Sequence, residues 1–172
     1  MFSTLAAIGT IILLAFLAAI IVSWIFKLPL VNFVSKHSTL LLRVIFIGAV
    51  IGSLIFSEIL QFPACILCWY QRLAIFPVAI IMLTGTIQNP LIRKQVLLLS
   101  SLGFLVALFH NYIDIFPTGI DVCGTSGVSC TARYVWEFGF VTIPLMSGAV
   151  LLSGILIALI SKRFPQQNLP KA

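Results

Sequence analysis

Five long apolar runs, separated by short polar breaks, make up most of this 172-residue sequence. A bilayer-spanning helix needs about 20 predominantly apolar residues. The predicted spans are Leu5–Phe26, Leu40–Leu60, Cys68–Ile87, Gln95–Phe116 and Phe138–Ile160. In the second run, Gly48, Gly52 and Ser53 are spaced for close packing against another helix. The sequence therefore predicts an all-α integral membrane protein, a four-helix transmembrane bundle preceded by one extra N-terminal transmembrane helix.

The composition agrees with a membrane location and argues against nucleic-acid binding. Hydrophobic residues make up 61% and charged residues 8% of the chain, whereas soluble proteins carry about 25% charged residues. The formal charge of +6 would indicate a nucleic-acid partner only if the basic residues clustered on a polar surface. They lie instead in the breaks between apolar runs, so we expect contact with membrane lipid and no nucleic acid.

The positions of the basic residues predict the orientation of the chain. Eight of the 10 Lys and Arg residues fall at alternate breaks, on one side of the membrane: Lys27, Lys36, Arg43, Arg93, Lys94, Lys162, Arg163 and Lys171. Cytoplasmic loops carry an excess of Lys and Arg, so we expect the C-terminus on the cytoplasmic side and the N-terminus outside. The first run lacks the positive n-region of a signal peptide and is too long for an h-region. We expect it to be retained.

Cys65 and Cys68 form a Cys-x-x-Cys pair where the third apolar run begins. Thiolates in the first turn of a helix lie next to its positive end, which makes them reactive. A disulfide that closes so small a loop would remove little entropy from the unfolded chain, so the spacing favours catalysis over a static bridge. Arg72 follows Cys68 by one turn and can share its face. Its guanidinium could stabilise a thiolate and bind an oxygen anion, or simply reach the lipid headgroups.

Cys123 and Cys130 lie in a polar, glycine-rich loop on the same predicted outer side, where the environment is oxidising and disulfides persist. Four cysteines allow three pairings, and spacing does not choose among them. An exposed bridge is open to thiol–disulfide exchange; the alternative is a loop staple worth roughly 2.5 kcal/mol at most. A four-cysteine zinc site is a further alternative. The six residues between Cys123 and Cys130 are unlike a zinc knuckle, and we predict no metal.

Two thiol pairs on one side of a membrane can pass electrons by thiol–disulfide exchange. Electrons that reach a helix thiolate at the bilayer edge need a lipid-soluble acceptor, and a quinone is apolar, carries two electrons and is confined to the bilayer. His110 lies one helical turn before Asp114, near the predicted outer end of its span. We expect this histidine to be either a proton carrier or a packing residue.

These motifs resemble the disulfide-bond formation protein B family (DsbB), most closely its short BdbC-like branch. The first signature is Gly52-Ser53-Leu54-Ile55-Phe56-Ser57-Glu58-Ile59, followed by Cys65-Ile66-Leu67-Cys68-Trp69-Tyr70-Gln71-Arg72. The second is the loop from Cys123 to Cys130 followed by residues 136–144, and His110 with Pro117 resembles the end of the family's third helix. The resemblance covers about Leu40–Ile160 and implies a four-helix membrane bundle that supports disulfide-bond formation.

The resemblance also implies a role for each site residue. Cys123 would be attacked by the thiolate of a soluble thioredoxin-fold, DsbA-like oxidase. Cys130 would then pass electrons to Cys65, and Cys68 would lie against the ring of ubiquinone or menaquinone. The quinone-binding residues would be Arg72 and His110. The implied enzyme is a protein-dithiol:quinone oxidoreductase of the bacterial cytoplasmic membrane, with both cysteine pairs on its outer face.

Two features depart from the family pattern. The run Leu5–Phe26 is extra to the four-helix core, and the loop cysteines are closer together than in longer-looped members. We divide the chain into an extra transmembrane helix (1–30), a four-helix redox bundle (38–164) and a cytoplasmic tail (165–172). The alternatives are a vitamin K epoxide reductase-like enzyme, in which the loop pair precedes the Cys-x-x-Cys, and a membrane scaffold or transport subunit with static disulfides.

Overall fold

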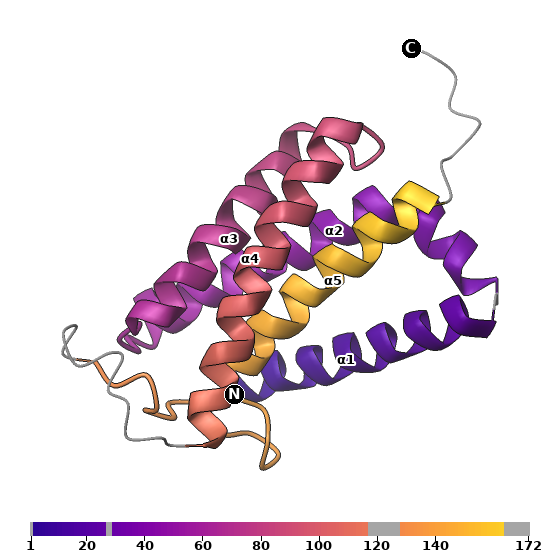
Figure 1. The fold of residues 1–172 in the computed structure, drawn as a ribbon. Helices are drawn as coiled ribbons and strands as arrows, with labels where there is room; N and C mark the ends of the chain where they lie inside the picture. The colour runs from indigo at the N-terminus through magenta and orange to yellow at the C-terminus, as the bar shows by residue number, and fades with distance from the viewer. Residues whose placement is uncertain (1, 27–28, 117–127, 164–172) are drawn as a thin grey trace.

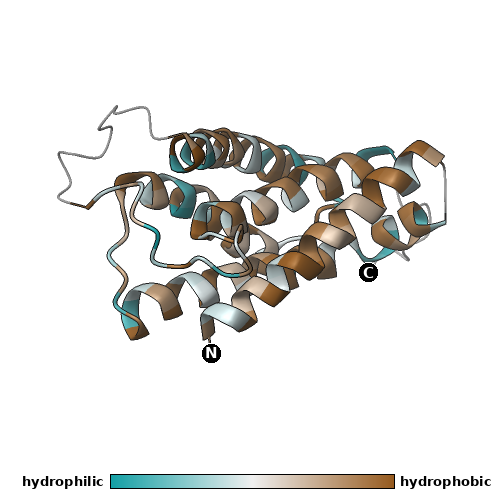
Figure 2. Ribbon diagram, turned by 90° about the horizontal axis from the view of Figure 1, so that it is seen from below, coloured by the Kyte–Doolittle hydropathy of each residue, from teal (hydrophilic) through white to brown (hydrophobic). Residues whose placement is uncertain are grey.

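The computed structural model describes residues 2–26, 29–116 and 128–163, which are mostly helical (Figure 1). The elements are α1 (Phe2–Phe26), α2 (Leu30–Leu54), the π-helical turn η1 (Ile55–Ile59), α3 (Ile66–Thr84), α4 (Pro90–Ile115) and α5 (Ile143–Arg163). By length and composition, α1, the joined α2 and η1, α3, α4 and α5 can each cross a membrane. Figure 2 shows apolar residues along all of them. The predicted all-α membrane protein with five spans is confirmed.

The helices form a bundle with α1 along one edge. α4 packs against α3 and α5, while α2 also contacts α3 and α5. The buried core between them includes Phe46, Met82 and Leu151. α1 contacts α2 and α5, and it contributes Leu17 and Ile20 to the same core. The second half of α1 is therefore anchored to the bundle by buried apolar side chains.

Glycines allow the helices to approach closely, but not at the positions that the sequence predicted. Gly103 in α4 is so close to Ala74 in α3 that an added Cβ would clash, and Gly154 in α5 is equally close to side chains of α2 and α4. In contrast, a Cβ on Gly48 or Gly52 would meet nothing within 4 Å. The predicted close helix packing at Gly48 and Gly52 is wrong, because both residues border a cavity.

α2 begins at Leu30 rather than at Leu40. The apolar pattern left Lys36 outside the predicted span, and the basic-residue pattern counted both Lys36 and Arg43 with the breaks, but both lie within this helix. Lys36 is exposed, and the Arg43 guanidinium donates hydrogen bonds to carbonyl oxygens at the end of α3, those of Met82 (2.7 Å) and Gly85 (3.1 Å). Because the last carbonyls of a helix have no intrahelical partner, Arg43 caps α3 from within α2.

α5 begins at Ile143 rather than at Phe138, because a tight turn precedes it. Phe138 and Gly139 have positive φ angles of 55° and 79°, which reverse the chain. Glu137 and Val141 then exchange backbone hydrogen bonds of 3.1 and 2.9 Å across the turn. The turn lies at the same end of the bundle as the start of α3 (Figure 1). The third and fourth helices also begin earlier than predicted, at Ile66 and Pro90.

Candidate redox site

The Cys-x-x-Cys pair sits at the start of α3, as predicted. Cys65 is the N-cap residue, and its Sγ accepts a hydrogen bond of 3.4 Å from the Cys68 backbone N–H. Both residues are free thiols, and their Sγ atoms lie 3.1 Å apart. Because the first N–H groups of a helix carry its positive end, this position stabilises negative charge on the Cys65 sulfur.

The environment of Cys65 lowers the pKa of its thiol to about 4. The main cause is the hydrogen bond shared with the Cys68 thiol, and a hydrogen bond with His110 acts in the same direction. Burial opposes both, because it disfavours the charged form. In the reduced pair, Cys65 is therefore a thiolate at neutral pH, which is the form that reacts in thiol–disulfide exchange.

His110 of α4 connects the Cys-x-x-Cys pair to the loop cysteine Cys130. The imidazole is buried, with 1% of the residue exposed. Its Nε2 lies 3.0 Å from the Cys130 carbonyl oxygen and 3.8 Å from Cys65 Sγ. A carbonyl oxygen only accepts, so Nε2 carries the hydrogen. Nδ1 accepts from the Gln71 amide at 3.0 Å. These hydrogen bonds assign the neutral tautomer that donates from Nε2 toward both cysteines.

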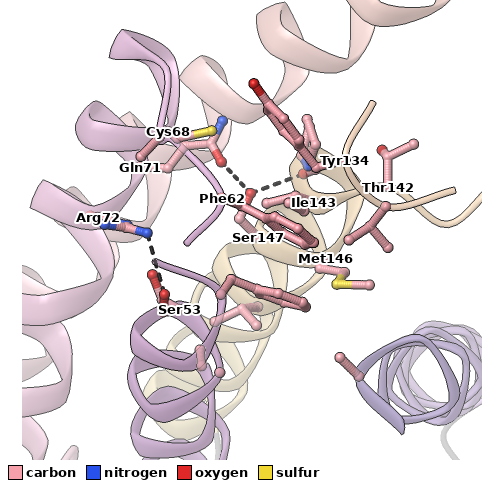
Figure 3. A pocket seen from close by; sticks show the side chains of 18 of the residues that line it. Ser53, Phe62, Cys68, Gln71, Arg72, Tyr134, Thr142, Ile143, Met146 and Ser147 are labelled. Atoms are coloured by element: carbon pink, nitrogen blue, oxygen red, sulfur yellow. Dashed lines mark hydrogen bonds between the residues drawn. The ribbon is translucent and has the colours of Figure 1, made fainter. Parts of the chain in front are cut away.

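Gln71 is a site residue that the sequence analysis did not identify. Its amide is buried in α3, and its Oε1 accepts a hydrogen bond from the Ser147 hydroxyl of α5 (Figure 3). This contact directs the amide nitrogen toward His110. A buried amide without partners is costly, so a glutamine in a largely apolar helix, three residues after Cys68 and directly before Arg72, was the available signal for a polar site.

Cys130 lies next to the Cys-x-x-Cys pair and is disulfide-bonded. It is buried in one apolar cluster with Cys65, Leu67 and Ile113. Cys123, the other predicted loop cysteine, is outside the described residues. Zinc binds cysteine as the thiolate. A disulfide-bonded Cys130 is therefore not available as a ligand of the four-cysteine zinc site that the sequence left as an alternative. Among the described residues, the possible metal-ligand group is instead Cys65, Cys68 and His110, whose ligand atoms lie within 4.8 Å of one another. The absence of a metal stays a prediction.

An ion pair holds the segment after Cys130 against the end of α4. Arg133 Nε donates to the Asp114 carboxylate at 2.9 Å, and its Nη2 donates to the Asp114 carbonyl oxygen at 2.6 Å. The same guanidinium lies over the Trp136 ring, 4.1 Å from its centroid. Asp114 follows His110 by one helical turn, so this contact keeps the Cys130 backbone near the imidazole.

Cys68 and Arg72 line a cavity of about 490 Å³ (Figure 3). Arg72 Nη2 donates to the Ser53 carbonyl oxygen of α2 at 3.3 Å, and the guanidinium lies 5.2 Å from the centroid of the Trp69 ring. Among the described residues, no other hydrogen-bond acceptor contacts Arg72. A guanidinium has several more N–H donors, so Arg72 can bind a ligand in the cavity without losing its contact to α2.

These contacts define a class of protein: a helical membrane protein in which two free thiols, a disulfide-bonded cysteine and a buried histidine meet at one end of the bundle. The model of the family described as "Disulfide bond formation protein DsbB" matches residues 35–161, and the chain belongs to this family. The family assignment made from the sequence motifs is therefore confirmed. α1 lies outside the matched residues.

Three relatives carry names that agree with this assignment. The SPbeta prophage-derived disulfide bond formation protein B of Bacillus subtilis (strain 168) is 38% identical over 134 residues, which are 76% of this chain and 90% of that protein. Disulfide bond formation protein C of the same organism is 39% identical over 112 residues (63% and 78%). Probable disulfide formation protein C 2 of Bacillus anthracis is 34% identical over 123 residues (70% and 87%). No solved structure matches the chain significantly.

Proposed function

We propose that this protein is a membrane protein-dithiol:quinone oxidoreductase that re-oxidises a soluble thioredoxin-fold, DsbA-like oxidase. In this way it would support disulfide-bond formation. The proposal is carried by the position of His110, which contacts the loop cysteine Cys130 and lies beside Cys65. A shared imidazole suits two redox pairs that exchange electrons, whereas two static bridges would have no need of it.

Electrons would pass along the protein in two thiol–disulfide exchanges, each transferring two electrons. First, the partner's dithiol reduces the Cys123–Cys130 disulfide, leaving a disulfide in the partner and two loop thiols. Next, the Cys130 thiolate attacks Cys65 of the Cys65–Cys68 disulfide and releases Cys68. Attack by Cys123 on Cys130 then restores the loop disulfide and releases the Cys65 thiolate. Free Cys65 and Cys68 thiols beside a disulfide-bonded Cys130 correspond to the end of this second exchange.

His110 would assist at the point where the two pairs meet. Its Nε2–H group faces both the Cys130 carbonyl oxygen and Cys65 Sγ. A hydrogen bond to an ionised sulfur favours the charged form, so the imidazole would stabilise Cys65 as the thiolate is released. Gln71 donates to the other ring nitrogen, which keeps the Nε2–H group directed at the two cysteines.

The cavity beside Cys68 fits a quinone in size, polarity and position. Its volume of about 490 Å³ lies within the range of about 300–1,000 Å³ found for small-molecule pockets. Apolar side chains form most of the wall, and Arg72 lines the cavity together with Cys68. Bound quinone, either ubiquinone or menaquinone, supplies an acceptor of two electrons and two protons for the Cys65/Cys68 dithiol. Arg72 would hold a quinone oxygen by a charge-assisted hydrogen bond.

We place the site on the outer face of the bacterial cytoplasmic membrane. α3 begins at the site end of the bundle, whereas Arg93 and Lys94 at the start of α4 and Lys162 and Arg163 at the end of α5 lie at the opposite end (Figure 1). The positive-inside rule makes that opposite end cytoplasmic. Residues 1–30 would then be the extra helix with its N-terminus outside, 38–164 the redox bundle and 165–172 a cytoplasmic tail.

The proposal is tested by following quinone reduction spectroscopically with the full-length protein in detergent. A reduced thioredoxin-fold oxidase supplies the electrons, and ubiquinone and menaquinone are tried separately. Wild type is compared with Cys68→Ala, Cys123→Ala and the control Thr84→Ala. Among the residues that the structure describes, the Thr84 hydroxyl bonds only carbonyl oxygens of its own helix turn, at the end of α3 away from the cysteines. We expect turnover by wild type and the control, and none by either cysteine variant.

Two outcomes would contradict the proposal. Wild type that reduces neither quinone, while its disulfides persist in the presence of the reduced partner, would support the static scaffold. Turnover by Cys123→Ala at the wild-type rate would show that the partner's electrons enter without the loop pair.

A further inference from the structure

The cavity beside Cys68 and Arg72 continues away from the redox pair to the first half of α1. We call this extension the α1–α2 arm and define it by six of its lining residues: Ala6, Gly9, Leu13, Val44, Gly48 and Gly52. Figure 3 shows α1 across the cavity from Cys68 and Arg72. The arm and the redox end belong to one cavity, so a single ligand can occupy both.

Glycines widen the arm on both of its walls. A Cβ added to Gly9 of α1, or to Gly48 or Gly52 of α2, would meet nothing within 4 Å. This differs from Gly103, where a Cβ would clash with a neighbouring helix. The three arm glycines are therefore not required for helix packing, and their missing side chains leave open space along the cavity.

The arm is apolar and open at the side of the bundle. Thr10 is the polar α1 residue on its wall, and the Thr10 hydroxyl is already bonded to the Ala6 carbonyl oxygen at 2.9 Å. Gly9 and Gly48 both line the cavity and are exposed. Since both glycines lie within segments that can cross a membrane, the opening faces the hydrocarbon of the bilayer.

We propose that the α1–α2 arm binds the prenyl tail of the quinone, with α1 as one wall of the tail site. This inference rests on the proposed function and extends it. The cavity divides as a prenylated quinone does: Arg72 at the redox end has further N–H donors that suit a ring oxygen, and an apolar channel that suits a hydrocarbon chain leads from there to lipid. α1 lies outside the residues matched by the family model, so this chain would use its additional helix to select the length or bulk of the tail.

The test compares the binding of tailed and tail-less quinones by quenching of tryptophan fluorescence in the purified, full-length protein. The two probes are menaquinone with a prenyl tail and menadione, which has the same ring without one. The variants Gly9→Leu and Gly48→Leu fill the arm, and their side chains enter open space. Ala19→Leu adds the same bulk at an exposed α1 position that does not line the cavity. Thermal unfolding verifies that every variant folds.

We expect Gly9→Leu and Gly48→Leu to weaken binding of the tailed quinone about tenfold more than binding of menadione. Ala19→Leu should leave the ratio of the two affinities at its wild-type value. A second readout uses a quinone with a photoreactive group on its tail, which should label peptides containing residues 6–13 and 44–52.

Failure of this inference can be told apart from failure of the proposed function. If wild type binds both quinones and the arm variants change their affinities equally, or if labelling falls on other helices, the tail site is wrong while quinone binding stands. If wild type binds neither quinone, the proposed function itself fails. Labelling of the arm by a photoreactive phospholipid, undiminished by excess menaquinone, would assign the arm to a lipid acyl chain and overturn the inference.

Discussion

At the residue scale, one amide controls the imidazole between the two cysteine pairs. The Gln71 side chain donates to His110 Nδ1 and accepts from Ser147, so rotation of the amide would break both contacts. His110 is thereby held with Nε2–H toward Cys130 and Cys65. In metal sites, loss of a comparable partner of a ligating histidine costs roughly 10–100-fold in affinity or activity, which indicates the size of effect to expect.

Substitution of Gln71 should therefore slow electron transfer between the cysteine pairs. We expect Gln71→Leu to lower the rate of exchange from the reduced loop pair to the Cys65–Cys68 disulfide about tenfold, at every pH tested. Gln71→Glu keeps the length of the side chain, but its carboxylate only accepts and cannot donate to Nδ1, so its rate should also fall about tenfold. Rapid quenching with a thiol reagent measures both rates. Gln71→Leu at the wild-type rate would rule out a positioning role.

The lowered pKa of Cys65, about 4, predicts a pH dependence of the reduced pair. A thiolate is present above the pKa of its thiol, so in a Cys123→Ala/Cys130→Ala background the thiolate absorbance should persist at neutral pH and disappear only as the pH falls toward 4. Adding Cys68→Ala removes the main stabilising hydrogen bond. The absorbance should then already be lost below about pH 8, as for an ordinary cysteine. Identical ultraviolet titrations with and without Cys68 would contradict this explanation.

The residues of the site differed in how well sequence could predict them. Cys65, Cys68 and Arg72 were found because their relation is local: spacing along one helix places them at its start and on one face. Gln71 and His110 are 39 residues apart, and only the packing of α3 against α4 brings them into contact. No local pattern relates them, so His110 remained ambiguous in the sequence and Gln71 received no role.

At the element scale, the bundle depends on a few positions where helices approach too closely for a side chain. Gly103 is one of them, because a Cβ there would overlap Ala74 and crowd Leu151. Overpacking of a well-filled core typically costs about 1–3 kcal/mol. Gly48 offers the matched case, a glycine within a helix whose Cβ would meet nothing within 4 Å.

We therefore expect opposite effects of one substitution at these two glycines. Gly103→Ala should lower the free energy of unfolding by about 1–3 kcal/mol. Gly48→Ala should raise it by about 0.5–1 kcal/mol, because alanine loses less conformational entropy than glycine in a helix. Thermal unfolding in detergent, followed by circular dichroism, compares both variants with wild type. Equal stability of the two variants would show that the close approach at Gly103 is not required.

Helix boundaries were less predictable than the existence of the helices. The apolar runs identified all five spans because bilayer thickness imposes their length. They misplaced the start of α2 because the polar residues from Ser35 to Thr39 looked like a loop, whereas Ser38 and Thr39 accept hydrogen bonds from the Gln88 side chain and the Ile87 backbone N–H. They misplaced the start of α5 because Phe138 is apolar but takes part in a chain reversal with positive φ. In both cases tertiary contacts or backbone geometry outweighed hydropathy.

At the scale of the whole molecule, the redox residues and the basic residues occupy opposite ends of the bundle. Cys65, Cys68, His110 and Cys130 lie where α3 begins and α4 ends, while the basic pairs at the start of α4 and the end of α5 lie at the other end. An odd number of spans places the start of α1 and the end of α5 on different sides. The proposed orientation therefore makes one prediction that does not depend on redox activity.

Single cysteines introduced at the two ends should react with an impermeant maleimide from different sides. In a variant with all four native cysteines replaced by alanine, Glu137→Cys reports on the redox end and Arg163→Cys on the basic end. We expect Glu137→Cys to be labelled in intact cells and Arg163→Cys only after the membrane is permeabilised, since Lys and Arg are retained on the cytoplasmic side. The reverse pattern would place the cysteine pairs in the reducing cytoplasm, where a disulfide at Cys130 would not persist. The chain could then not re-oxidise a partner outside the membrane, even if its exchange chemistry were intact.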